Sequence, residues 1–255
     1  MTGGQAGRRA GGQAGRRAGG QAGRRAGGQM ERPVRALLLR VVLGGLILSA
    51  CPPAPLPAQD AKSIVSRAAF AYRSLSSLRA DFDQLIENQM IGNAASKGVL
   101  VQSGEARLSM RFSEPPGEAI VIDGRFVWVY TPSTTPGQVL RLPVPSGGPV
   151  YGYNLLAWLL DRPAERYSST YVRPDRLDNR AMDVVEMIPT VPDMPFGRAT
   201  VWLDRSDGLP RRMEIEETSG QRRTLTLHNL RVNQPVSAKA FTFDVPDGVR
   251  IVDQG

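Results

Sequence analysis

The chain has 255 residues, of which 41% are hydrophobic, and it carries a formal net charge of +8 with one cysteine and one histidine. Such an inventory excludes an internal disulfide and the usual zinc ligand sets. The charge does not indicate a nucleic-acid partner, because residues 1–58 hold nine of the 32 basic and one of the 24 acidic residues, leaving 23 of each sign.

Residues 1–29 are dominated by a low-complexity octad repeat, AGGQAGRR, which contains six arginines and no acid. Without apolar periodicity the repeat cannot bury a core, so we expect it to be disordered. Met30 follows the last copy and opens an ordinary signal peptide, which favours a misassigned upstream start for residues 1–29. A basic arm that binds nucleic acid is the alternative interpretation.

Residues 30–59 are organised as an export signal. A basic start is followed by an apolar core at 41–50 and a Pro-rich linker. Ten apolar residues are too few to span a bilayer, which needs about 20. Cys51 closes the stretch LSAC, which resembles a lipobox whose thiol is acylated. The alternative is cleavage near Ala58 or Gln59, so the protein is predicted to be periplasmic, either free or lipid-anchored to the outer membrane.

The exported part, residues 60–255, is predicted to be one domain. Residues 60–84 open as a helix, with Asp60 as its N-cap and apolar side chains at helical spacing. Short strands follow at 99–101, 106–112, 119–122, 126–130 and 139–142, and again at 182–188, 198–203, 211–217 and 222–230. A helix at 154–161, apolar nearly all round, interrupts them before Pro163. This order predicts a mainly β fold with helices (α+β), in which a strongly curved antiparallel sheet wraps around its helices.

The hairpin IVIDGRFVWVYTP at residues 120–132 is apolar on both faces. An antiparallel hairpin at a protein surface normally shows one apolar and one polar face. A helix of the same chain, a partner or a ligand therefore has to cover the second face.

Catalytic machinery is not recognisable in the sequence. His228 lies in an alternating strand and is interpreted as a polar-face residue, and no G-x-S-x-G elbow accompanies it. Carboxylates lie in turns or alternate on polar strand faces, and no Gly-rich phosphate loop joins a strand to a helix. We therefore expect neither an enzyme nor a cofactor or metal.

Apolar surface is the remaining signal. A plain core packed on the first helix accounts for any one of these residues. Together they also fit an apolar pocket with the 154–161 helix as its lid, which would remove lipid methylenes from water at about 0.8 kcal/mol each. The candidate lipid-binding residues are Met110, Phe112, Ile120, Ile122, Trp128, Tyr130, Leu155, Leu156, Trp158 and Leu159.

The exported chain resembles the LolA/LolB family of bacterial outer-membrane lipoprotein carriers. The family has a first helix followed by F-x-Q, a hairpin of the form DG-x-x-x-W-x-Y-x-P and an ending of the form F-x-F-x-x-P-x-G-V. The matching segments are residues 76–84 (SSLRADFDQ), 98–100 (GVL), 114–116 (EPP), 120–132 and 238–249 (AKAFTFDVPDGV).

The resemblance implies an incomplete antiparallel β-barrel that encloses a hydrophobic cavity closed by a helical lid. The implied function is a monomeric periplasmic chaperone that takes acylated lipoproteins from an inner-membrane exporter complex to an outer-membrane acceptor. An anchored receptor of the LolB type, acylated at Cys51, and an envelope module that senses lipoproteins stay open as alternatives.

One position departs from the family pattern. Where relatives commonly carry an Arg-Pro-Gly turn, this chain has QSGE at residues 102–105. The arginine that the family is thought to use to latch its lid thus has no counterpart at Ser103, and no latch role is assigned from the resemblance.

Overall fold

The computed structural model describes residues 60–90, 92–145, 152–192 and 194–254. The repeat, the signal region and Cys51 lie outside these residues. All described residues belong to one compact unit. None of its described helices is long and apolar enough to cross a membrane.

The first helix is shorter than its apolar spacing predicted. Helix α1 covers Ala61–Arg73, and the Asp60 side chain caps it by accepting a hydrogen bond from the backbone N–H of Lys62, as expected. Residues 77–84, predicted as the end of this helix, instead begin strand β1 (Ser77–Asn88). That prediction was wrong because Leu78, Ala80 and Phe82 alternate with polar residues, a period of two that belongs to a strand.

A curved, open sheet of twelve strands follows. Its strand order is β12-β6-β5-β4-β3-β2-β1-β11-β10-β9-β8-β7, and every pairing is antiparallel except that of β12 with β6. Consecutive strands are neighbours almost throughout, as expected of a meander. The remaining strands are β2 (Gly92–Ser103), β3 (Arg107–Glu114), β4 (Ala119–Ile122), β5 (Phe126–Tyr130), β6 (Gln138–Pro143), β7 (Tyr167–Leu177), β8 (Arg180–Pro189), β9 (Phe196–Asp204), β10 (Pro210–Glu217), β11 (Arg222–Val232) and β12 (Arg250–Asp253).

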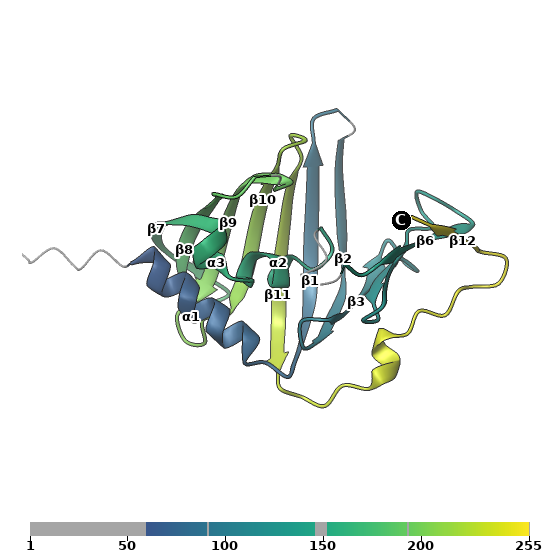
Figure 1. Ribbon diagram of the computed structural model, residues 1–255, viewed down its shortest axis with the longest axis horizontal. Coiled ribbons are helices and arrows are strands. Elements are labelled where there is room, and N and C mark those ends of the chain that lie inside the picture. Colours follow the sequence, from purple (N-terminus) through teal and green to yellow (C-terminus); the bar gives the residue numbers. More distant parts are fainter. Residues whose placement is uncertain (1–59, 91, 146–151, 193, 255) are drawn as a thin grey trace, which may run out of the picture. The chain divides into compact units, whose positions relative to one another are not determined.

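Helices cover one face of this sheet, which we call the inner face. Helices α1, α2 (Leu155–Leu160) and α3 (Pro163–Arg166) lie on that side, with α1 crossing the β7–β11 half (Figure 1). Strand residues pointing inward join α1 and α2 in one hydrophobic core. The predicted curved antiparallel sheet around its helices is therefore confirmed.

The opposite, outer face carries its own apolar cover in two places. Met182, Val184 and Trp202 form a second buried cluster on β8 and β9. Further along the sheet, the segment after the short 3₁₀ helix η1 (Ala238–Phe241) places Phe243 against the aromatic side chains of β5. Covering both faces removes apolar surface from water on each side of a single sheet layer.

Candidate functional site

Helix α2 fills the inner face of the sheet. All six of its residues are buried, although the helix has less than two turns. The Asn154 side chain caps it by accepting a hydrogen bond from the backbone N–H of Ala157 at 3.1 Å. A helix this short is not stable by itself in water, so packing holds α2 in place.

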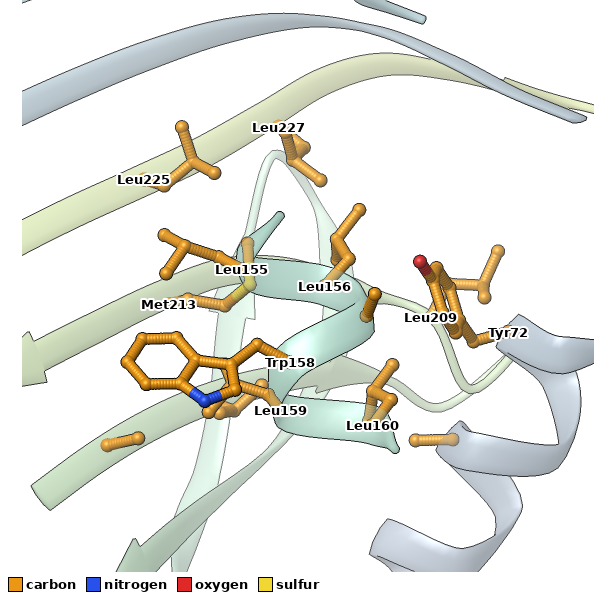
Figure 2. Packing of buried hydrophobic residues seen from close by; sticks show 14 of the residues in the cluster. Tyr72, Leu155, Leu156, Trp158, Leu159, Leu160, Leu209, Met213, Leu225 and Leu227 are labelled. Atoms are coloured by element: carbon orange, nitrogen blue, oxygen red, sulfur yellow. The ribbon is translucent and has the colours of Figure 1, made fainter. Parts of the chain in front are cut away.

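Both sides of α2 are in contact with the core. Leu155 and Trp158 point from α2 toward the strands, where Met213 and Leu225 lie, and Leu160 lies on the side of α1 (Figure 2). The Trp158 ring meets Phe196 edge-on with centroids 4.8 Å apart. These contacts make α2 an apolar plug between α1 and the sheet.

Beside the first turn of α2 the core leaves a small cavity of about 20 Å³. A volume of this size holds about one water molecule, so this cavity is too small for an alkyl chain. Helix α2 forms one wall of this cavity, and strands β1–β4 and β11 form the other. The apolar residues that line the cavity include Leu100, Leu108, Met110, Ile120, Leu156 and Leu225.

The ten candidate residues divide between the two faces of the sheet. Met110 pairs with Ile120 across β3 and β4, and both belong to the inner face. Ile120 in turn pairs with Val129, which places the alternate residues Trp128 and Tyr130 on the outer face. The structure thus brings eight candidates together on the inner side, namely Met110, Phe112, Ile120, Ile122, Leu155, Leu156, Trp158 and Leu159.

Trp128 and Tyr130 have partners of their own on the outer face. Phe243 stacks on Trp128 and tilts against Tyr130, each at a centroid distance of 5.7 Å. The Trp128 indole N–H donates to Asp123 Oδ2 at 2.9 Å. Burial alone would raise the pKa of Asp123, but this bond and two backbone N–H groups of its turn outweigh it, so the pKa is lowered. The second apolar face of the hairpin is therefore covered by the C-terminal segment of the same chain.

A buried polar cluster lies where α1, β2 and α2 meet. Gln102 Nε2 donates to the Tyr72 hydroxyl and, at 2.7 Å, to the carbonyl of Gly104. The Asn154 side chain lies beside the same hydroxyl. Tyr72, Gln102 and Asn154 are 3%, 4% and 2% exposed, so this cluster is buried. No sequence motif indicated it, because its three members are far apart in the chain.

Arg223 on β11 is a second residue that the sequence did not single out. Its Nη1 donates to the carbonyl of Gly152, two residues before the α2 cap, at 2.9 Å. Its Nη2 pairs with Glu217 Oε1 at 3.2 Å. This arginine therefore holds the segment that precedes α2 against β11. Ser103, where the family pattern has its latching arginine, lies on a different strand, β2.

His228 lies away from α2, on the outer face. Its ring nitrogens contact Asp83 at 3.0 Å and Asp178 at 3.1 Å, at the edge of a polar depression of about 860 Å³. The predicted polar-face position agrees with this placement. In the part of the chain that the structure describes, no three His, Cys, Asp or Glu side chains converge as metal ligands do.

Comparisons with known proteins agree with one another. The model of the family described as outer membrane lipoprotein carrier protein LolA matches residues 73–244. An outer-membrane lipoprotein carrier protein of Chromohalobacter salexigens is 27% identical over 225 residues, covering 85% of this chain and all of the relative. That of Pseudomonas aeruginosa is 24% identical over 212 residues, covering 79% of this chain and 93% of the relative.

Among solved structures, an uncharacterized conserved protein from Thermus thermophilus shares the fold. It has a TM-score of 0.50 and 13% identity, with 77% of this chain and all of that chain covered. A LolA superfamily protein from Nitrosomonas europaea is 17% identical with a TM-score of 0.40, over 72% of this chain and 97% of that chain.

Proposed function

The chain belongs to the LolA family of outer-membrane lipoprotein carrier proteins, and we propose that it is a periplasmic chaperone that holds the acyl chains of lipoproteins against the inner face of its sheet. The observation that carries this proposal is α2, a short and wholly apolar helix that is buried against the inner face of the sheet. A plug without polar residues can be exchanged for alkyl chains with little change in the chemistry of the contact.

Exchange of α2 for a ligand is energetically reasonable. Each methylene transferred from water to an apolar site contributes about 0.8 kcal/mol, so ten buried methylenes contribute roughly 8 kcal/mol. We propose that the eight inner-face candidates line or close this site: Met110, Phe112, Ile120, Ile122, Leu155, Leu156, Trp158 and Leu159. No bond is made or broken in such a cycle.

The direction of transport implies partners on both sides of the periplasm. An inner-membrane exporter complex would supply the acylated lipoprotein, and an outer-membrane acceptor would receive it. Acylation of Cys51 would instead make the chain an anchored acceptor, which the mass of the mature N-terminus decides.

The test is release of lipoproteins from spheroplasts by the protein produced from the full chain. We expect the supernatant to contain stoichiometric complexes of the protein with acylated lipoproteins. The Ile120→Asp variant should release none, because it places a carboxylate on the inner face. Trp128→Leu is the matched control on the same hairpin and should release as much as the wild type, because its side chain points to the outer face.

Release by neither the wild type nor the control would contradict a carrier role. Loss of release in Trp128→Leu, with the fold intact by circular dichroism, would show that the outer face takes part in cargo binding.

A further inference from the structure

The polar cluster of Tyr72, Gln102 and Asn154 contains a buried polar atom that has no hydrogen-bond partner within the described residues. The atom is Gln102 Oε1, which has no hydrogen-bond donor among these residues. The Asn154 side chain, whose Oδ1 accepts from the backbone N–H of Ala157, interacts with the Tyr72 hydroxyl. Nine or more of every ten buried polar groups in proteins are paired, so an unpaired oxygen on a side chain that is 96% buried is costly.

The hydroxyl of Tyr72 contacts the same Gln102 side chain. It accepts the Gln102 amide proton, and it keeps its own proton because burial raises the pKa of this phenol above the usual value. The Tyr72 hydroxyl therefore keeps a donor, and Gln102 Oε1 is an unpaired acceptor on the side chain that contacts it.

The position of the cluster connects it to the plug. Tyr72 is on α1 and Gln102 on β2, two elements that are anchored in the core, whereas Asn154 is the cap of α2. The cavity beside α2 is lined by Asn154 and by Leu155 and Leu156, which follow it in the chain. Displacement of α2 would remove Asn154 and leave the hydroxyl of Tyr72 and the carboxamide of Gln102 on the inner face.

We propose that Tyr72 and Gln102 form a polar subsite that hydrogen-bonds a secondary amide in the acylated N-terminus of the cargo. A secondary amide has one carbonyl acceptor and one N–H donor, which complement the Tyr72 hydroxyl and Gln102 Oε1. An ester offers only the acceptor, and an alkyl chain offers neither. The inference rests on the proposed function, since it assigns the polar end of the same lipid site.

Two amides of an acylated N-terminus share this chemistry. One joins an N-linked acyl chain to the first residue, and the other is the first peptide bond. A triacylated lipopeptide contains both, while a diacylated lipopeptide of the same sequence has a free amine in place of the first. Comparing the two ligands therefore identifies which amide is bound.

The experiment measures affinity of the protein produced from the full chain for three probes: a synthetic triacylated cysteine lipopeptide, its diacylated counterpart and diphenylhexatriene, an apolar dye without polar groups. Tyr72→Phe and, separately, Gln102→Met are compared with the wild type. We expect each variant to bind the triacylated lipopeptide about tenfold more weakly, which corresponds to about 1.4 kcal/mol. Dye affinity should be unchanged, because the alkyl part of the site is untouched.

Tyr171→Phe is the matched control, since it removes a tyrosine hydroxyl from an inner-face residue outside the cluster. It should leave all three affinities unchanged. A loss confined to the triacylated ligand identifies the N-acyl amide, and an equal loss for the diacylated ligand identifies the peptide amide.

Two results would overturn the subsite: unchanged lipopeptide affinity in both variants, or a parallel loss for the dye. Binding of the dye but not of either lipopeptide by the wild type would also overturn it. Failure of the wild type to bind any of the three probes would instead overturn the proposed function, and the subsite with it.

Discussion

Leu156→Ala is expected to open helix α2 selectively. Leu156 is 1% exposed in the closed molecule, where it packs between α1 and the sheet, and it would be solvated when α2 leaves the inner face. Truncation of a buried leucine to alanine costs about 2.7–5 kcal/mol, set by the lost transfer energy and the cavity that remains. Because the open form does not bury this side chain, the cost falls on the closed form alone. A loss of about 3 kcal/mol shifts the equilibrium toward the open form by roughly 100-fold.

Hydrogen exchange measured residue by residue tests this reasoning. Amides of α2 should exchange roughly 100-fold faster in Leu156→Ala than in the wild type. Val184→Ala is the matched control, because Val184 is also 1% exposed but belongs to the outer-face cluster on β8 and β9, which stays buried whether α2 is closed or open. It destabilises the closed and open forms equally, so it should accelerate the slowest amides of the sheet, which exchange by global unfolding, and leave those of α2 unchanged. Acceleration of α2 in Val184→Ala as large as that of the sheet would refute the idea that α2 opens as a separate unit.

Three further predictions concern the sheet and its hold on α2. Gly98→Ala should lower the free energy of unfolding by about 1–3 kcal/mol, because a Cβ there would overlap the backbone of β3. Gly197→Ala is the control, since a Cβ at that position has open space around it. Equal melting temperatures of the two variants would contradict this prediction. Arg223→Met removes the hydrogen bond to the carbonyl of Gly152 and should increase proteolytic cleavage in the segment before α2. Unchanged cleavage would contradict this prediction. Hydrogen bonds, chiefly from the Trp202 indole, lower the pKa of Asp175 to about 2. The ionised carboxylate therefore stabilises the folded protein fully at pH values above its usual pKa of 3.8, and this contribution is lost as the pH falls toward 2. The stability difference between wild type and Asp175→Asn, measured by urea unfolding, should therefore shrink over that interval; a constant difference would count against it.

Residues close together in the sequence were sufficient to predict much of the sheet and helix α2. The strands predicted at 119–122 and 126–130 are β4 and β5 with the same bounds, because the Asp123-Gly124 turn separates two short apolar runs. The helix predicted at 154–161 is α2 with Asn154 and Asp161 as its caps. In each case a turn former or cap lies directly beside an apolar run, which fixes both the type and the ends of the element.

Faces were harder to predict than elements. In the hairpin of β4 and β5 both faces are apolar, so alternation separates Trp128 from Val129 without saying which of them points inward. The cover of the outer face comes from Phe243, distant in sequence, whose place after Phe241 matches the ending shared with the family. Strand β7 was missed for a related reason: its solvent-exposed edge is rich in polar residues and lacks an apolar run. The Tyr72 cluster likewise depends on contacts among three distant segments.

The length of α2 constrains how the site opens. A six-residue helix detached from its partners is unstable, since isolated helices below about 12–15 residues are marginal in water. Displacement from the inner face therefore leaves two outcomes for the segment: it unwinds, or it packs again on the ligand that replaced it. Unwinding adds conformational entropy to the open form and exposes six apolar side chains, whereas packing on alkyl chains covers those side chains again. The second outcome couples opening to ligand burial, so exchange protection of α2 should return when an acylated ligand is bound, and it should not return with a ligand that leaves α2 unfolded.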